Sequence, residues 1–227
     1  MKYELLLFDA DGTLFDFEKC EADALSNTLS RFNISFPDED LSALFKRVNI
    51  KIWEEFENKL ITAGELKTER FRRYFSLINV DADPQEFSNE YLLNLSRGTD
   101  LLPGALDLIK SIHTDFKIVI ITNGLTSVQK PRFENSAIFP YVDKYVISEE
   151  FGIPKPNKEI FEHALSVAGH AEKSTTLMIG DKLSSDIKGG INFGVDTCWY
   201  NPYSKPNSSD IKPMYEIKSL PELKQII

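Results

Sequence analysis

A short apolar run near the start of the sequence ends in two carboxylates: Leu5-Leu6-Leu7-Phe8-Asp9-Ala10-Asp11-Gly12-Thr13-Leu14-Phe15-Asp16. In an extended backbone residues i and i+2 point to the same side, so Asp9 and Asp11 can converge on one reacting atom. Two like charges that close resist joint ionisation, and a divalent cation is the usual compensation. This stretch therefore predicts a strand that ends in a metal-assisted catalytic site.

Short apolar runs of this kind recur, and helical periodicity fills the intervals between them. Strands are expected at 3–9, 117–122, 144–148, 175–180, 196–200 and 214–217. Helices are expected at 104–113, 127–135, 157–168 and 184–192, with a last one from residue 221. Near-continuous apolar strands are typical of parallel sheets that are covered on both faces. The alternation predicts an open α/β sheet.

The interval between residues 16 and 97 breaks this alternation, because it shows helical periodicity and no convincing strand. Helices are expected at 22–31, 38–60, 62–78 and 84–96, with helix starts near 35–38 and 81–84. Thr62 is the expected N-cap of the third helix, and Glu65 occupies its capping-box position. An insert of about 80 residues is too long for a loop. We therefore expect an all-helical bundle domain at 16–97 and an α/β core formed by 1–15 and 98–227.

Composition and charge exclude several classes of partner. The 227 residues carry a net charge of −9, whereas a nucleic-acid polymer needs a basic surface; a small anionic substrate is not excluded. No apolar run approaches the roughly 18 residues that a membrane span needs. Cys20 and Cys198 lack zinc-ligand spacing, so we expect two buried thiols. With no secretory signal, these features favour a cytoplasmic protein without a membrane partner.

Open α/β sheets bind ligands at the carboxyl ends of their strands, and polar residues follow several of the expected strands here. Thr122-Asn123-Gly124 ends one strand and offers a hydroxyl, an amide and backbone N–H groups that suit phosphate oxygens. Taken alone, an ordinary strand-to-helix turn explains this stretch better. Lys155 stands between two prolines before a helix, and as a fixed cation it would hold both carboxylates and an incoming anion. Most lysines, however, are solvated surface residues.

A second pair of carboxylates follows the strand expected at 175–180. Asp181 comes directly after this apolar run, and Asp186 lies five residues further on. Asp186 has a simple alternative role as a helix-capping residue, but a charge straight after a buried strand is hard to explain as surface. Carboxylates, backbone carbonyls and waters are the ligands that Mg²⁺ prefers. The four features together predict one site.

The order of these motifs is DxDGT, a helical insert, an apolar strand with TNG, KP and GDxxxxD, and it resembles the haloacid dehalogenase-like phosphatase superfamily along the whole chain. The resemblance is closer to the bacterial pyrimidine 5′-nucleotidases of this superfamily, on Phe8-Asp9-Ala10-Asp11, Thr13-Leu14-Phe15, Leu102-Pro103-Gly104-Ala105, Ile120-Ile121-Thr122-Asn123-Gly124, Val146-Ile147-Ser148-Glu149-Glu150, Lys155-Pro156-Asn157-Lys158 and Gly189-Gly190-Ile191-Asn192. It implies a doubly wound, Rossmann-like parallel sheet with a helical cap at 16–97. The implied activity is hydrolysis of a small phosphate ester, a pyrimidine nucleoside monophosphate.

The resemblance also implies roles for the carboxylates. Asp9 would be the nucleophile that forms an aspartyl-phosphate, and Asp11 the general acid and base. Mg²⁺ would be held by Asp9, Asp181 and the backbone carbonyl of Asp11, with Asp186 acting directly or through water. The presence of Asp11 argues for phosphate chemistry rather than dehalogenation. Lys182, directly after Asp181, departs from the small or hydroxylic residue that many relatives carry there.

Thr122, Asn123 and Lys155 would hold the phosphoryl oxygens, in catalytic and substrate-binding roles. In the helical insert Asn49 and Trp53 lie one helical turn apart and share a face, so both are candidates for substrate binding. An aromatic ring there would stack on a base, although packing inside the bundle explains Trp53 at least as well. Phe17 is a further residue expected near the site.

Other activities share part of this pattern. A phosphosugar phosphatase or a phosphomutase of the same superfamily carries the same four motifs. A phospho-accepting signalling domain also combines an Asp, a Thr, a Lys and Mg²⁺, but its acceptor follows the third strand and no large cap is inserted. A catalytically silent binding protein is the least favoured alternative, since each motif position is filled. The oligomeric state is left open.

Overall fold

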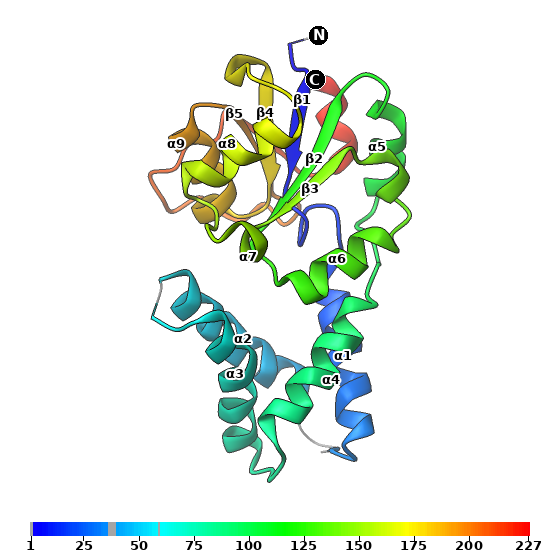
Figure 1. Ribbon diagram of the computed structural model, residues 1–227, viewed down its shortest axis with the longest axis vertical. Coiled ribbons are helices and arrows are strands. Elements are labelled where there is room, and N and C mark those ends of the chain that lie inside the picture. Colours follow the sequence, from blue (N-terminus) through cyan, green and yellow to red (C-terminus); the bar gives the residue numbers. More distant parts are fainter. Residues whose placement is uncertain (1, 36–39, 59) are drawn as a thin grey trace. The chain divides into compact units, whose positions relative to one another are not determined.

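The computed structural model describes residues 2–35, 40–58 and 60–227. Two compact units make up the chain (Figure 1). One unit combines Met1–Phe17 with Thr99–Ile227, and the other is Glu18–Gly98. The polypeptide thus leaves the first unit after its first strand and returns to it after residue 98.

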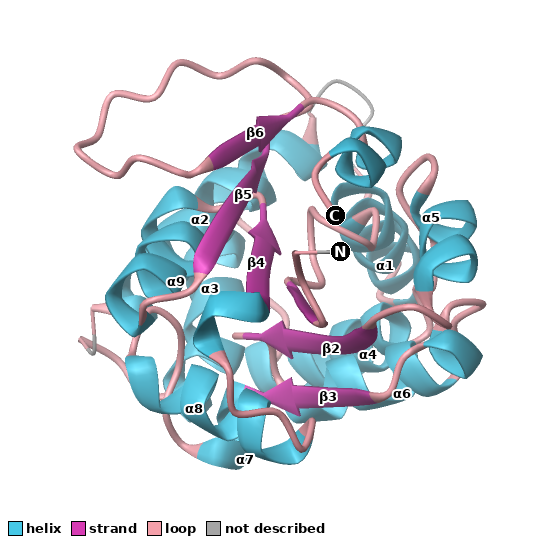
Figure 2. Cartoon of the chain, turned by 90° about the horizontal axis from the view of Figure 1, so that it is seen from above, coloured by secondary structure: helices cyan, strands magenta, loops and turns pink. Residues whose placement is uncertain are grey.

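The first unit contains a parallel sheet of six strands in the order β3-β2-β1-β4-β5-β6. The strands are β1 (Leu5–Phe8), β2 (Lys117–Thr122), β3 (Lys144–Ile147), β4 (Thr176–Gly180), β5 (Asp196–Tyr200) and β6 (Tyr215–Ile217). Figure 2 shows the sheet from above, with β2 and β3 on one side of it and β4, β5 and β6 on the other. Because β1 pairs with both β2 and β4, the carboxyl ends of these three strands meet. The predicted α/β fold with a doubly wound parallel sheet is confirmed.

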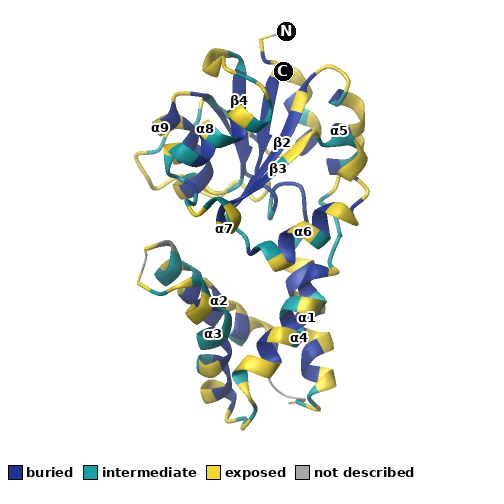
Figure 3. Cartoon of the chain, in the orientation of Figure 1, coloured by how far each residue is buried: buried dark blue, intermediate teal, exposed yellow. Residues whose placement is uncertain are grey.

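Helices cover both faces of this sheet, as the side-chain alternation of β1 requires. Leu6 and Phe8 face a core formed with α5 (Ala105–Ile112), α6 (Thr126–Glu134) and the 3₁₀ helix η4 (Leu220–Gln225). Leu5 and Leu7 face the other core, which α8 (Lys158–Val167) and α9 (Lys188–Phe193) complete. All four β1 side chains are buried, and Figure 3 shows the central strands in the buried colour.

Three short elements were not expected from sequence, and two expected helices take another form. The additional elements are η1 (Phe139–Tyr141), α7 (Ser148–Phe151) and η2 (Lys173–Thr175). The helix expected at 184–192 begins as a π-type turn, η3 (Leu183–Ile187), before α9. Its start is held by the Asp186 carboxylate, which accepts a hydrogen bond from the backbone N–H of Lys182. The last expected helix, from residue 221, is the 3₁₀ helix η4, whose hydrogen bonds run over i→i+3.

The second unit is helical, with α1 (Phe17–Arg31) entering it, α2 (Leu41–Glu57), α3 (Ala63–Ile78) and α4 (Pro84–Ser96). The capping box of α3 is present: the Thr62 side chain accepts from the Glu65 N–H, and the Glu65 carboxylate accepts from the Thr62 N–H. The Asp83 side chain caps α4. The start of the helix expected from residue 38 lies outside the described residues.

Aromatic rings form the interior of the helical unit. Phe71 of α3 lies at the centre, with ring centroids 5.4 Å from Phe45 and 4.9 Å from Phe87. Tyr74, Phe75 and Tyr91 complete the cluster. Each such ring pair contributes about 0.5–1.5 kcal/mol beyond the burial of its area. This packing gives the unit a core of its own.

Two further expectations concern the whole chain. Across the described residues, every helix is too short or too polar to cross a membrane. Cys20 and Cys198 are both buried thiols that form no disulfide with each other, as predicted. Burial raises the pKa of the Cys198 thiol to about 12, and the nearby Glu222 adds to the shift. The Cys198 thiol is therefore a poor nucleophile.

Candidate active site

The backbone turns sharply after β1 and presents Asp9 at the carboxyl end of the strand. The carbonyl of Ala10 accepts hydrogen bonds from the N–H groups of Leu14 and Phe15, each at 2.9 Å. Gly12 adopts a φ of +84° within this turn, a conformation that L side chains rarely take. The DxDGT sequence thus folds into a compact loop that fixes the direction of both carboxylates.

Lys155 is buried at the centre of the site, with a side chain only 1% exposed. Its Nζ lies 2.6 Å from Asp9 Oδ1, 2.7 Å from Asp186 Oδ1 and 2.7 Å from the carbonyl oxygen of Ile121. Burial opposes the charged form, but Asp186 and Asp9 outweigh it and raise the pKa of Lys155. The predicted cation therefore stays protonated and pairs with two of the predicted carboxylates.

Asn123 fixes the backbone that carries this lysine. Its side-chain Nδ2 donates to the carbonyl of Lys155 at 2.9 Å, and its Oδ1 accepts from the N–H of Lys155 at 2.8 Å. This pair of bonds links the end of β2 to the loop before α8. The arrangement gives Asn123 an observed role in positioning Lys155, and its contact with a phosphoryl group stays a prediction.

Thr122 offers its hydroxyl at the end of β2. The Oγ1 atom accepts hydrogen bonds from the N–H of Gly124 at 3.1 Å and from Nε2 of Gln129 at 3.2 Å. Because both contacts use the oxygen as acceptor, the hydroxyl hydrogen can donate to an anion. This is the geometry that the predicted phosphate-binding role needs.

Asp9, Asp181 and Asp186 form a carboxylate cluster in which one oxygen from each lies within 4.8 Å of the others. Burial raises the pKa of Asp9, and that of Asp181 to about 7, with Asp186 contributing to both shifts. The Thr13 hydroxyl lies between the first two, 3.4 Å from Asp9 Oδ2 and 3.5 Å from Asp181 Oδ1. Three converging carboxylates, with the pKa of Asp9 and that of Asp181 raised, fit a hard divalent cation, which favours the ionised form of its ligands.

Asp11 is held by two residues that the sequence analysis did not select. Arg132 Nη1 lies 2.6 Å from Asp11 Oδ1, and Gln129 Nε2 donates to Asp11 Oδ2. Both come from α6, three residues apart and therefore on one face of the helix. The available signal was this i, i+3 spacing in the helix that follows the TNG strand end.

The two candidate residues of the helical unit occupy different settings. Asn49 is buried and donates from Nδ2 to Glu21 Oε1 at 2.6 Å, while its Oδ1 lies 3.4 Å from Arg70 Nη1. Trp53 is half-buried, with its ring edge-to-face against Phe56 at 5.7 Å. Asn49 therefore bridges two buried charged side chains, whereas Trp53 keeps part of its ring exposed. Substrate binding by either stays a prediction.

Comparison with known proteins identifies the family of this chain. Residues 3–194 match the haloacid dehalogenase-like hydrolases. The chain belongs to this family of hydrolases. The resemblance stated from the motifs is thereby confirmed.

Two curated members of the haloacid dehalogenase-like family resemble the chain over their full length. Pyrimidine 5′-nucleotidase YjjG of Escherichia coli is 37% identical over 227 residues, covering 100% of this chain and 99% of the relative. Pyrimidine 5′-nucleotidase PynA of Streptococcus pneumoniae is 36% identical, covering 98% and 94%. The crystal structure of the HAD-hydrolase YfnB from Bacillus subtilis, bound to magnesium, superposes with a TM-score of 0.93 at 38% identity, covering 100% of this chain and 99% of that one.

Proposed function

We propose that this protein is a Mg²⁺-dependent phosphomonoester hydrolase that acts as a 5′-nucleotidase on pyrimidine nucleoside monophosphates. The observation that carries the chemistry is the position of Asp9. Its carboxylate stands at the carboxyl end of β1, paired with the buried Lys155 and clustered with Asp181 and Asp186. The substrate class is supported by the nucleotidase names of the two full-length relatives.

In the first half-reaction Asp9 attacks the phosphorus atom of the ester. A bond forms between an Asp9 carboxylate oxygen and phosphorus, and the bond from phosphorus to the ester oxygen breaks. The departing alkoxide takes a proton from Asp11, which acts as the general acid. An aspartyl-phosphate on Asp9 and a free nucleoside result.

In the second half-reaction a water oxygen attacks the same phosphorus atom. Asp11, now a carboxylate, removes the proton from this water, and the bond between phosphorus and the Asp9 oxygen breaks. Inorganic phosphate leaves, and both aspartates return to their starting states. One residue thus serves as acid and then as base, which the mechanism needs because the two half-reactions move a proton in opposite directions.

The residues around the nucleophile supply charge and orientation. Lys155 and Thr122 donate to the phosphoryl oxygens, and Asp9, Asp181, Asp186 and the Asp11 carbonyl would hold Mg²⁺. The bound cation neutralises the charge that opposes the approach of one anion to another. Most of the rate enhancement of phosphoryl transfer comes from this kind of positioning and electrostatic stabilisation. The helical insert, with Asn49 and Trp53, is proposed to select the substrate.

A phosphatase screen tests this function directly. The purified protein is assayed for phosphate release with Mg²⁺ or with EDTA, over nucleoside monophosphates, phosphosugars and phospho-acids. We expect activity only with Mg²⁺ and a preference for pyrimidine monophosphates. A preference for phosphosugars would overturn the nucleotidase assignment, and no release from any ester would overturn the phosphatase assignment.

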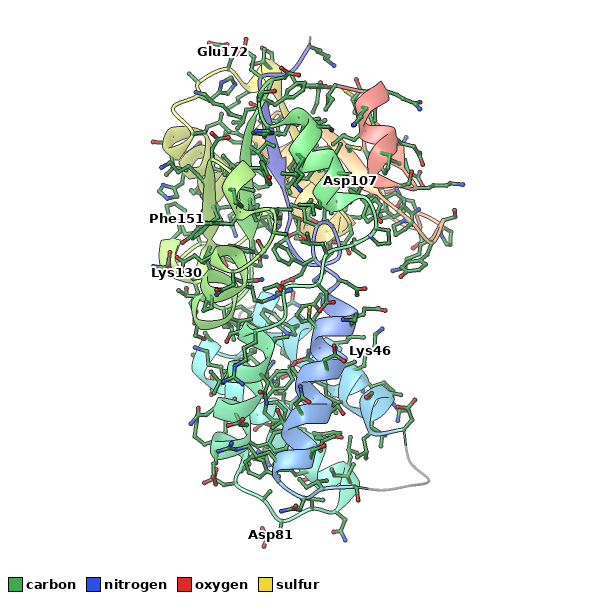
Figure 4. The ribbon with its side chains drawn as sticks, turned by 90° about the vertical axis from the view of Figure 1, so that its right-hand side faces the viewer. Lys46, Asp81, Asp107, Lys130, Phe151 and Glu172 are labelled. Atoms are coloured by element: carbon green, nitrogen blue, oxygen red, sulfur yellow. The ribbon has the colours of Figure 1, made fainter. Side chains whose placement is uncertain are left out.

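The nucleophile is tested with a matched pair of variants. Asp9→Asn should reduce turnover to a trace and abolish the acid-stable, hydroxylamine-sensitive phosphoenzyme that quenched wild-type protein accumulates. Asp107→Asn makes the same change at an exposed aspartate of α5, labelled in Figure 4, and should leave both unchanged. A substantial phosphoenzyme in Asp9→Asn would show that another residue is phosphorylated.

A further inference from the structure

We propose that Gln129 and Arg132 of α6 are positioning residues that hold Asp11 in place for its two proton transfers. The inference deepens the proposed function and rests on it. Both carboxylate oxygens of Asp11 are engaged by this helix: Oδ1 by Arg132 Nη1 at 2.6 Å, and Oδ2 by Gln129 Nε2. A carboxylate held through both oxygens has a defined plane, so the direction of its remaining lone pairs is set.

Arg132 is itself held rigidly. Its side chain is fully buried, its guanidinium lies over the rings of Phe15 at 5.0 Å and Phe17 at 5.8 Å, and its Nη1 also donates to Gln129 Oε1 at 3.0 Å. Stacking on aromatic faces and a carboxylate partner both compensate a buried guanidinium. The support behind Asp11 is therefore a fixed group and not a mobile surface arginine.

The glycine of the TNG stretch provides an independent observation. The backbone of Gly124 passes so close to Gln129 that an added Cβ would meet the Cγ atom of this side chain at 2.6 Å. Gly124 is not among the five glycines of the described chain that have a positive φ, so its backbone conformation does not require a glycine. Its missing side chain instead makes room for the glutamine that reaches Asp11 and Thr122.

Each carboxylate of the DxD pair thereby has its own cation. Lys155 pairs with Asp9, and Arg132 pairs with Asp11. The two cations therefore have different roles. Lys155 contacts the nucleophile Asp9, and Arg132 contacts Asp11, the residue that carries the proton. A well-oriented general acid or base contributes about 10²–10⁴-fold to rate, and a displacement of the group forfeits part of that factor.

The test exploits the leaving group. The p-nitrophenolate ion departs without a proton, whereas the alkoxide of a nucleoside needs one, so only the second substrate requires a positioned acid in the first half-reaction. Phosphoenzyme formation is measured by rapid quench from p-nitrophenyl phosphate and from uridine monophosphate, with Mg²⁺. The proteins compared are wild type, Arg132→Met and Gln129→Met. Lys130→Met, at an exposed lysine of the same helix labelled in Figure 4, is the matched control.

We expect Arg132→Met and Gln129→Met to slow phosphorylation by uridine monophosphate by about ten- to a hundredfold and by p-nitrophenyl phosphate by less than about threefold. Hydrolysis of the phosphoenzyme needs Asp11 as a base, so p-nitrophenolate should appear as a burst followed by a slow steady state. Lys130→Met should match wild type on both substrates. Gln129→Met removes only an uncharged amide, and it carries the test should Arg132→Met fail to fold.

A double-mutant cycle separates positioning from a direct role. In an Asp11→Asn background, adding Arg132→Met should change the rate of phosphorylation by uridine monophosphate by less than about threefold. Residues that act as one unit are strongly non-additive. Equal loss on both substrates, no loss on either, or full additivity with Asp11→Asn would overturn the inference. Wild-type protein without activity on either ester would overturn the proposed function and the inference with it.

Discussion

Gly12 and Asp181 approach so closely that a Cβ atom on Gly12 would lie 2.7 Å from Oδ2 of Asp181. The two residues belong to the loops after β1 and β4, which are neighbouring strands of the sheet. The glycine of the DxDGT turn thus serves a second purpose beyond its φ of +84°. It leaves space for a carboxylate that completes the cluster around Asp9.

Gly12→Ala is therefore expected to damage the site more than backbone strain alone explains. Gly152 has a φ of +86° and no atom within 4 Å of an added Cβ, so Gly152→Ala reports the cost of the backbone conformation by itself. That cost is about 1–2 kcal/mol. Gly12→Ala should show at least this loss in urea unfolding together with a large loss of Mg²⁺-dependent phosphate release. Equal behaviour of the two variants would contradict a steric role for Gly12 at Asp181.

Lys155→Met removes the cation that two buried carboxylates share. Breaking a buried ion pair from one side typically costs about 3–5 kcal/mol, because the remaining charge is left uncompensated. We expect a loss of this size in urea unfolding with EDTA, and a larger stabilisation by Mg²⁺ than in wild type, since the metal supplies the missing positive charge. Lys158→Met, at an exposed lysine, should change stability by less than about 0.5 kcal/mol. A Lys155→Met protein as stable as wild type in EDTA would show that Asp9 and Asp186 need no cation.

The raised pKa of Asp181 predicts how metal binding depends on pH. Burial raises this pKa from 3.8 to about 7, so the folded protein binds the proton more tightly than the unfolded chain. The resulting stability is complete below the unfolded value and is lost as pH rises through about 7. Mg²⁺ binds the ionised carboxylate, so the rise in Tm from EDTA to Mg²⁺ should be small near about pH 5.5 and large near about pH 8. Asp107→Asn should keep this pH dependence, and Asp181→Asn should flatten it. A wild-type rise in Tm that is the same at both pH values would refute a link between Asp181 ionisation and Mg²⁺ binding.

Asn49→Leu is expected to destabilise the helical unit. The substitution leaves the buried Glu21 without the 2.6 Å hydrogen bond that it accepts from Asn49, and burial already raises the pKa of this glutamate. An unpaired buried acceptor costs about 1–3 kcal/mol, which urea unfolding measures. Trp53→Phe, at a half-buried residue on the same helix, is the comparison variant. It should lower the free energy of unfolding by less than Asn49→Leu does. An Asn49→Leu variant of wild-type stability with a raised KM would instead indicate a direct substrate contact.

The sequence predicted most of this protein because its local patterns agree with one another. Apolar runs of strand length ending in Asp9, Thr122 and Asp181 identified the strands and their carboxyl ends. In a parallel sheet those ends lie at one edge whatever the strand order, so the residues of one site were selected before their contacts were known. Thr62 with Glu65 likewise identified a helix start through a purely local capping interaction.

Contacts that depend on strand order were beyond the sequence. Arg132 and Gln129 share a helix face through their i, i+3 spacing, but nothing local shows that this face meets Asp11. They reach Asp11 because β1 lies beside β2 in the sheet, which brings the helix after β2 to the loop after β1. The start of η3 was missed for a similar reason, since Asp186 binds a backbone N–H there while also pairing with Lys155.

The sequence by itself determined the fold class, the strand ends and the set of chemical groups, because periodicity and turn residues act over a few neighbouring positions. Only the tertiary structure decided which cation serves which carboxylate: Lys155 serves Asp9, and Arg132 serves Asp11. These pairs join residues more than a hundred positions apart. Burial then makes each pairing specific, since a charge removed from water needs a particular partner at hydrogen-bond distance.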